Sequence, residues 1–302
     1  MHEPRGTFTH GDYTVGWICA LPESELVAAM AMLDEKHPVL PTIDPHDSNS
    51  YVLGRIGDHN VVIACLPAET TGRVSAATVA KDMIRSFSAV RFGLMVGIGG
   101  GAPYYGPRRN NDLGTNKEEE DSEDTEESDD NQEDLRDIRL GDVVISLHSK
   151  SSDAVVQYDF GKSLQEREFI LSGGKLNKPP SIVLSAVAHL KAQHEMEGHQ
   201  ILKTLSTIMS NYPALATKFQ HPGSRKDYLF KPGYLHEAGK KTCKSCRSLE
   251  SNFVKRDNRP DDSPRLHYGT IGSADQVMKD ALLRDKWASE ESIICFEMEA
   301  AG

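Results

Sequence analysis

The sequence predicts an α/β fold, a three-layer sandwich in which a mostly parallel, mixed central sheet lies between helices. Short apolar runs rich in β-branched residues alternate with amphipathic helical patterns along the chain. Several of these runs are apolar throughout, as expected of strands that are buried on both faces. Glycines or carboxylates follow the ends of these runs, where open α/β sheets bind ligands.

Each element follows from its local pattern. Pro22 opens the first helical pattern, and Gly57-Asp58 separates two runs typical of a β-hairpin. In the first half we predict a strand at 13–20, a helix at 23–35, strands at 51–56 and 60–66, a helix at 74–87 and a continuous buried strand at 91–98. In the second half we predict a strand at 143–147, a helix at 181–195, a strand at 267–271, a helix at 274–287 and a strand at 292–296.

Two segments differ in composition from this single domain, which we expect to span 1–302. Residues 117–137 hold 13 acidic residues against two basic ones, so this stretch accounts for the whole net charge of −11. A segment with so few apolar residues cannot offset its ordering entropy, and 110–137 is predicted to be a disordered acidic insertion. Residues 199–264 are polar and irregular, with weak helical patterning near 201–209, and are predicted to be a surface insertion.

The bulk composition excludes several classes of protein. No apolar run approaches the roughly 20 residues that span a bilayer, and the N-terminus lacks the apolar core of a signal peptide. We therefore expect a cytoplasmic protein without a membrane partner. No basic stripe suggests a nucleic-acid partner. The odd number of cysteines argues against a disulfide framework, and Cys19, Cys65 and Cys295 lie in apolar runs typical of core positions.

The remaining cysteines form a C-x-x-C pair, Cys243 and Cys246. Such a pair can be half of a zinc site, with His236 or His267 as a remote partner. No second C-x-x-C accompanies it, so two thiols in a surface insertion are the favoured interpretation. No metal site is predicted.

A glycine cluster follows the run at 91–98. Gly97 to Ala102 fits the dinucleotide pattern G-x-G-x-x-A, but that fingerprint needs a helix directly afterwards, and Pro103 to Pro107 cannot begin one. We reject the dinucleotide interpretation and predict no cofactor. Glycines at a strand end still let the backbone approach a ligand, although a plain tight turn explains them equally well.

Carboxylates follow two other strand ends. Glu297-Met298-Glu299 comes directly after the last apolar run, and Glu23 and Glu25 follow the first. Buried carboxylates are costly without partners, which points to a site. The alternative is a solvated helix start, where acidic residues complement the helix dipole.

In this order, the elements resemble the nucleoside phosphorylase and nucleosidase superfamily, particularly its fungal branch and the methylthioadenosine/S-adenosylhomocysteine nucleosidases. The resemblance rests on VGWICALPESELVAAMAMLDE, MVGIGGGAP, DIRLGDVVIS, and HYGTIGSADQVMKD followed by CFEMEAAG. It implies cleavage of the bond between ribose and a purine nitrogen through an oxocarbenium-like transition state. Carboxyl groups suit the acid, base and acceptor roles of that reaction.

The resemblance implies two catalytic residues. Glu25 matches the water-activating glutamate when the register is counted back from Leu33. Counting forward from Ala20 gives Ser24 instead, so the chain has one extra residue here, and Glu23 is the alternative. Glu299 matches the glutamate that binds the ribose hydroxyls. Further substrate contacts are implied for Thr70, Thr71, Gly72, Gly97, Gly99, Gly100, Gln276, Val277 and Met298.

The resemblance also bears on the reaction type. Phosphorylases of this family bind phosphate with an arginine and a serine. This chain has Met95 and Ile98 at those positions, so Arg73 is the only nearby cation. Hydrolysis of a purine nucleoside of the adenosine type is therefore expected. The alternatives are phosphorolysis and a catalytically deficient domain that senses nucleosides or nucleotides in a fungal receptor-like protein. The family's acid aspartate lies on a strand beyond EMEAAG, so we expect a domain that is incomplete at its C-terminus and lacks this acid. Relatives form dimers or larger homo-oligomers.

Overall fold

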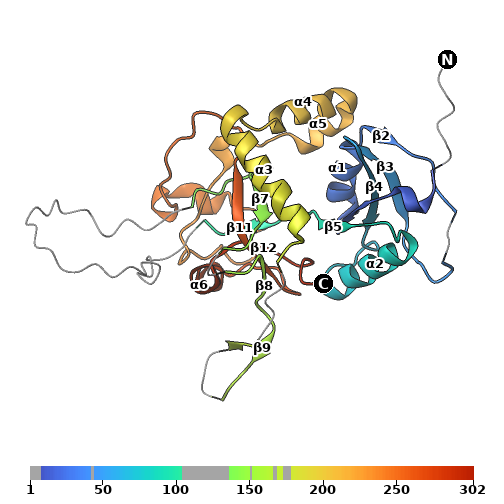
Figure 1. Cartoon of the computed structure of the whole chain (residues 1–302). Coiled ribbons are helices and arrows are strands. Elements are labelled where there is room, and N and C mark those ends of the chain that lie inside the picture. Colours follow the sequence, from blue (N-terminus) through green and yellow to red (C-terminus); the bar gives the residue numbers. More distant parts are fainter. Residues whose placement is uncertain (1–7, 42–43, 104–135, 150–151, 166–168, 173–177) are drawn as a thin grey trace, which may run out of the picture.

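A computed structural model describes residues 8–41, 44–103, 136–149, 152–165, 169–172 and 178–302. The strands of this part form two five-stranded sheets and one two-stranded sheet, with helices packed around them (Figure 1). Parallel and antiparallel pairs occur in both large sheets. The predicted α/β class with mixed, mostly parallel sheets is confirmed, and hydrogen bonding divides the strands between two sheets.

The first sheet has the order β2-β3-β4-β1-β5. Its strands are β1 (Val15–Cys19), β2 (Glu35–Lys36), β3 (Tyr51–Ile56), β4 (His59–Cys65) and β5 (Phe92–Met95). Along β4, Val62 and Ala64 pack into one core cluster and Val61 and Ile63 into another. Successive side chains of a strand point to opposite faces, so both faces of this sheet are buried. This explains why the central part of β4 is apolar at every position.

One helix covers each face of the first sheet. Helix α2 (Arg73–Ser86) packs on the Val62 face through Val79 and Met83, as the pattern at 74–87 predicted. On the other face, a five-residue π-helical turn, η2 (Pro22–Leu26), leads into α1 (Val27–Ala31). The predicted helix at 23–35 is therefore wrong at its C-terminal end, because the chain leaves the helix to pair β2 with β3.

The second sheet is built around β11. Its strands are β6 (Gly100–Gly101), β7 (Val143–Ser146), β8 (Val155–Gln157), β11 (Leu266–Ser273) and β12 (Ile293–Glu297). Strand β11 pairs in parallel with β7, β8 and β12, and β6 pairs antiparallel with β12. The short strands β9 (Gly161–Lys162) and β10 (Ile170–Leu171) form the two-stranded sheet. A cluster that includes Trp287 of α6 (Ala281–Glu291) packs with Ile293 and Phe296 of β12.

Two predictions around these sheets are corrected. The helix expected at 274–287 begins only at Ala281, because the Asp280 side chain accepts hydrogen bonds from the backbone N–H groups of Leu282 and Leu283. The strand expected at 91–98 is shorter, and it is not fully buried. Strand β5 lies at the edge of its sheet, and Leu94 is 37% exposed.

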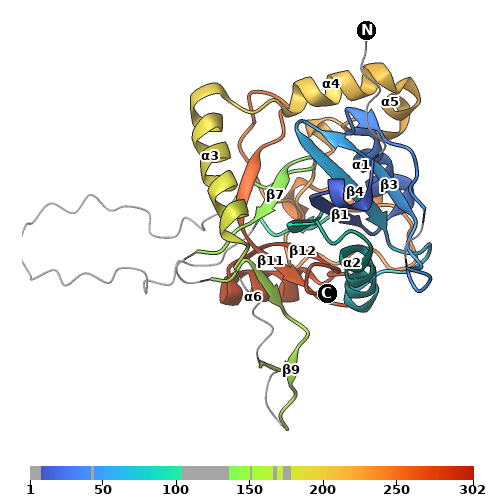
Figure 2. The same ribbon diagram turned by 45° about the vertical axis from the view of Figure 1, so that its right-hand side comes forward.

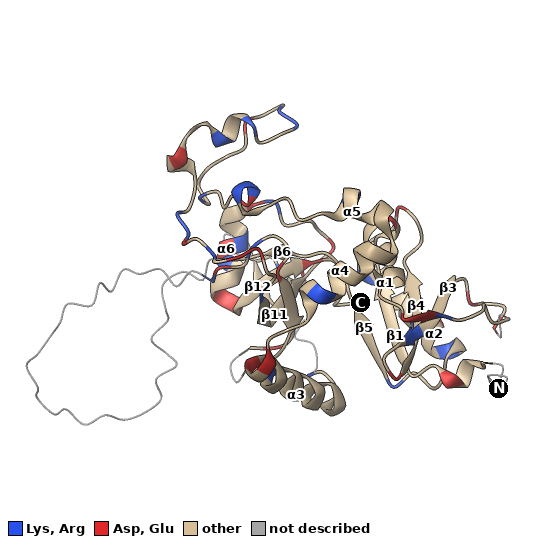
Figure 3. Cartoon of the chain, turned by 90° about the horizontal axis from the view of Figure 1, so that it is seen from above, with Lys and Arg blue, Asp and Glu red and all other residues tan. Residues whose placement is uncertain are grey.

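The second half contributes helices outside the sheets. They are α3 (Ser181–Glu197), α4 (Ile201–Asn211) and α5 (Pro213–Phe219), followed by the short turns η4 (Ser224–Lys226), η5 (Ser245–Ser248) and η6 (Glu250–Asn252). No residue of α3, α4 or α5 is fully buried, and Figure 2 shows α4 and α5 outside the sheets. Figure 3 shows Lys and Arg recurring along the loop beyond α5. Within the described ranges, no helix is long and apolar enough to cross a membrane. Apart from Arg136 and Asp137, the acidic segment 110–137 lies outside these ranges.

A buried ionic cluster attaches the C-terminal part of segment 199–264 to the second sheet. The Asp142 side chain is fully buried and accepts hydrogen bonds from Arg259 Nη2 at 2.7 Å and His267 Nε2 at 2.9 Å. Burial by itself raises the pKa of Asp142, but these bonds and the backbone N–H groups of Arg265 and Arg139 hold it well below its ordinary value. His267 is therefore bound to Asp142, and among the described residues it is His236, not His267, that lies beside the cysteine pair.

Candidate functional site

The segments that follow β1, β4, β5, β11 and β12 are linked by contacts, and most of the predicted site residues lie in them. The loop after β4 contacts the segments after β11 and β12 through Gly72 and Arg73. The loop after β5 contacts the segment after β1 at Ile98, and Gly99 packs against Cys295 of β12. We call this region the carboxyl-end site. Its position agrees with the general location of ligand sites in open α/β sheets.

Glu25 is held rigidly by backbone donors. Its Oε2 atom accepts from the N–H groups of Ala20 at 2.7 Å and Leu21 at 3.0 Å, and its Oε1 atom accepts from Ile98 at 2.8 Å. The residue is 9% exposed. A carboxylate has about four acceptor positions, so three bonds leave one free position, on Oε1. The side chain is thus fixed and keeps one lone pair for another donor.

The π-helical turn explains the register ambiguity of the sequence. Leu26 donates to the carbonyl of Leu21, five residues back, so this turn contains one residue more than an α-helical turn. The extra residue therefore stays within the turn, and Glu25 is the residue that points inward. The alternative, Glu23, has a side chain that is 90% exposed and lies 4.0 Å from Lys218. The geometry therefore favours Glu25 over Glu23 as the carboxylate of the candidate site.

The glycine loop after β5 packs closely against Glu25 and Cys295. A Cβ atom at Gly97 would lie 2.8 Å from Glu25 Oε1, and one at Gly99 would collide with the Cys295 sulfur. Gly100 belongs to β6 and pairs with Phe296. Gly97 and Gly99 are therefore required by close packing, which a plain tight turn would not demand.

Glu299 joins the two sheets. Its Oε1 atom accepts from the backbone N–H of Gly72 at 3.1 Å, and its Oε2 atom accepts from that of Met298 at 3.3 Å. Gly72 has a φ of 93°, which side chains rarely adopt, and a Cβ there would lie 2.8 Å from Asp275. The predicted residues Gly72, Met298 and Glu299 are therefore brought together.

Arg73 is engaged by carboxylates that the sequence analysis did not single out. Its Nη2 atom lies 2.6 Å from Asp275 Oδ2 and 3.3 Å from Asp159 Oδ2, and its backbone N–H donates to Asp275. The hydrogen bond to Asp275 is the main cause that raises the pKa of Arg73. Asp275 directly precedes Gln276 in a segment predicted to be helical, so its position after β11 had no local signal.

Glu297 is a further carboxylate at this site. It ends β12, and its Oε2 atom accepts from the N–H groups of Glu299 and Ala300, both at 2.8 Å. Burial raises the pKa of Glu297, and hydrogen bonds from Ser273 and these two N–H groups oppose the shift. The sequence showed two carboxylates at this strand end, and the structure places both in the site.

The other predicted contacts are more exposed. The Thr70 hydroxyl donates to the Pro67 carbonyl at 2.6 Å, and Thr71 is exposed. The Gln276 carbonyl accepts from the Tyr158 hydroxyl at 3.3 Å, and the Val277 side chain is exposed. These residues flank the carboxyl-end site in its loops, but no polar side chain of theirs contacts Glu25 or Glu299 among the bonds described.

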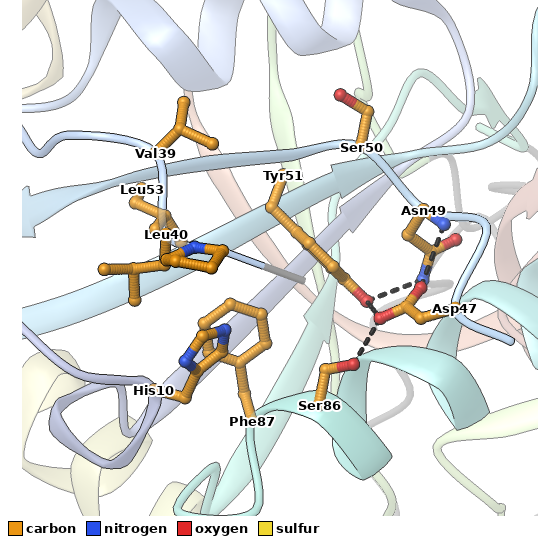
Figure 4. A pocket seen from close by; sticks show the side chains of 11 residues that line it. His10, Val39, Leu40, Asp47, Asn49, Ser50, Tyr51, Leu53, Ser86 and Phe87 are labelled. Carbon is orange, nitrogen blue, oxygen red and sulfur yellow. Dashed lines mark hydrogen bonds between the residues drawn. The ribbon is translucent and has the colours of Figure 1, made fainter. Parts of the chain in front are cut away.

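A cavity of about 230 Å³ lies elsewhere, between β3, α2 and the N-terminal turn (Figure 4). Tyr51 donates to Asp47 Oδ2 at 2.8 Å, Asn49 donates to the Tyr51 oxygen at 2.9 Å, and Ser86 also bonds to Asp47. Burial raises the pKa of Asp47, but these bonds and Arg85 bring it below its ordinary value. The polar groups satisfy one another, which is typical of a structural network. None of the predicted site residues lines this cavity.

No model of a known protein family matches the sequence. The chain is 39% identical over 291 residues to a nucleotide-binding leucine-rich repeat (NLR)-like protein of Hyaloscypha variabilis. The match covers 96% of this chain but 25% of the relative, so the chain spans about a quarter of that protein's length.

The comparison with solved structures found two nucleosidases among its matches. The 5'-methylthioadenosine/S-adenosyl homocysteine nucleosidase of Campylobacter jejuni has a TM-score of 0.47 at 13% identity, covering 96% of this chain and 76% of that one. Futalosine hydrolase of Helicobacter pylori strain 26695 has a TM-score of 0.45 at 14% identity, covering 97% of this chain and 77% of that one.

Proposed function

We propose that the domain hydrolyses the N-glycosidic bond of a purine nucleoside, with Glu25 and Glu299 as its catalytic carboxylates. The observation that supports this most is the geometry of Glu25, which is buried, held by three backbone N–H groups and left with one acceptor position. Such a group can orient a water molecule and accept its proton as the bond to the base breaks.

Glu299 has the complementary role in this proposal. Its two oxygens each accept one backbone hydrogen bond, which leaves acceptor positions for the hydroxyl groups of a ribose. A fixed negative group beside the sugar also stabilises the positive charge that develops on its ring in the transition state. Met298 adjoins it and supplies an apolar surface for the sugar.

The ion pairs of Arg73 favour hydrolysis over phosphorolysis. Its guanidinium is already paired with Asp275 and Asp159, so it is poorly suited to bind an inorganic phosphate. The loop residues Met95 and Ile98 provide no charge. Within the described residues we therefore assign the attacking nucleophile to water.

The test is a panel of purine nucleosides and nucleotides incubated with the protein, with and without phosphate. We expect the free base and free ribose at a rate that phosphate does not change, measured by chromatography and mass spectrometry of both products. Ribose 1-phosphate as the main sugar product would contradict hydrolysis and favour a phosphorylase.

A second candidate function is nucleoside or nucleotide sensing without turnover. It is favoured by the similarity to an NLR-like protein, of which this chain matches only a part. Calorimetry on the same panel separates the two functions. A ligand that binds but releases no base would support sensing, whereas turnover supports the enzyme.

Gly97 provides a test that leaves every carboxylate in place. Gly97→Ala puts a methyl group 2.8 Å from Glu25 Oε1, so we expect turnover to fall by roughly 100-fold, as displacements of about 1 Å can cause. Gly93→Ala is the matched control on the strand that precedes this loop, because no heavy atom lies within 4 Å of its added Cβ. Equal turnover of both variants in a steady-state assay would contradict a role for the Glu25 position.

A further inference from the structure

The C-x-x-C pair of the surface insertion does not stand alone in the structure. His236, Cys243 and Cys246 each direct one potential ligand atom inward, and these atoms all lie within 4.8 Å of one another. His236 Nδ1 is 3.2 Å from Cys246 Sγ and 3.8 Å from Cys243 Sγ. Nitrogen and sulfur ligands of a tetrahedral zinc ion are separated by about 3.6 Å, given bonds of about 2.05 and 2.3 Å. The observed distances lie on either side of that value.

The surroundings of the three residues fit a metal ion. His236 Nε2 lies 2.8 Å from the Lys240 carbonyl, so that nitrogen donates and Nδ1 is left with its lone pair toward the sulfurs. The Asn252 side chain donates to the carbonyl of Cys246 at 3.1 Å, which fixes the backbone that carries this sulfur.

The local fold shows why a metal would matter here. Between 231 and 250, Cys246 is the only residue that is fully buried, so this segment has almost no apolar core of its own. Its base is closed by pairing of Phe230 with Phe253 and by the backbone bond from Lys231 to Asn252. A short segment of this kind usually depends on a metal or a disulfide for a defined structure.

We propose that His236, Cys243 and Cys246 bind one Zn²⁺ ion, with a water molecule in the fourth position, and that this ion holds segment 231–253 in its fold. Two sulfurs and one nitrogen are a typical zinc ligand set and exclude Mg²⁺ and Ca²⁺, which require oxygen ligands. The segment leads directly to Arg256 and Arg259, which pair with Asp137 and Asp142. The ion therefore stabilises the part of the insertion that precedes these contacts.

The experiment measures metal in the intact protein, loaded with Zn²⁺ and desalted without chelator. Elemental mass spectrometry should find about one zinc ion per chain. The double variant Cys243→Ser/Cys246→Ser should lose at least nine-tenths of this zinc. His189→Ala, on the exposed surface of α3, is the control and should keep the full amount. His236→Cys replaces one ligand by another and should also retain zinc.

Two further measurements make the result decisive even if the double variant folds poorly. Co²⁺ loaded into the unaltered protein should give a thiolate-to-metal charge-transfer band, and removal of zinc should speed tryptic cleavage within 231–253 by tenfold or more. Thiol titration after desalting distinguishes the alternatives. Unmetallated free thiols, or a Cys243–Cys246 disulfide without bound metal, would overturn the proposal.

Discussion

Glu25→Gln is expected to lower the turnover number for nucleoside hydrolysis by about 10²–10⁴-fold, the usual contribution of a general base. The amide keeps the size of the side chain but cannot accept a proton from water. Because the substrate is bound mainly by other groups, the Michaelis constant should change little. Steady-state kinetics with the best substrate of the panel measures both constants.

The same substitution has a structural effect that needs its own control. The nitrogen of the new amide would face a backbone donor, either Ile98 or the pair Ala20 and Leu21, and a hydrogen bond would be lost at a cost of about 1–3 kcal/mol. Thermal unfolding is therefore measured together with the kinetics. Glu23→Gln is the matched control, since its exposed side chain should be replaceable without loss of activity. Normal turnover in Glu25→Gln together with a loss in Glu23→Gln would reverse the assignment.

Asp142→Asn is expected to reduce the free energy of unfolding at pH 7 by about 3–5 kcal/mol, as is usual when one partner of a buried ion pair is removed. Asp142 is fully buried, and its loss leaves the charged Arg259 with Asp137 as its remaining carboxylate partner. Denaturant unfolding measures the effect. Asp58→Asn, in the exposed turn between β3 and β4, is the control and should change stability by less than about 0.5 kcal/mol.

The effect of Asp142→Asn should also depend on pH. The pKa of Asp142 is lower in the folded state, so its contribution is fully present above the unfolded-state pKa of about 3.9 and is lost as the pH falls toward the folded-state value. The difference between the unaltered protein and the variant should therefore narrow below about pH 4. A difference that stays constant from pH 7 to pH 3 would show that the charge of Asp142 contributes nothing.

The local sequence predicted most of the strands, the hairpin turn and the strand ends at which the candidate site residues lie. Strand β1 and residues 61–65 of β4 carry no polar side chain apart from the cysteine thiols because α1 and α2 cover both faces of the sheet, so their burial follows from composition. Gly57 adopts a positive φ in the predicted hairpin turn. Glu25 and Gly97 follow the ends of neighbouring parallel strands of one sheet, which brings them to one edge. Glu299 follows a strand of the second sheet.

Long-range contacts decided the rest. The choice between Glu23 and Glu25 depended on a π-helical turn, since the sequence indicates one extra residue here but not where the backbone accommodates it. Arg73 pairs with Asp275 and Asp159, which lie 202 and 86 positions away in the chain. The residues adjacent to Arg73 in the sequence therefore gave no sign that its guanidinium is already paired. His236, rather than His267, joins Cys243 and Cys246 because the fold places its ring beside the two sulfurs, whereas His267 lies beside Asp142. Sequence patterns report local periodicity and charge, whereas these groupings arise from which distant side chains the fold places within hydrogen-bonding distance.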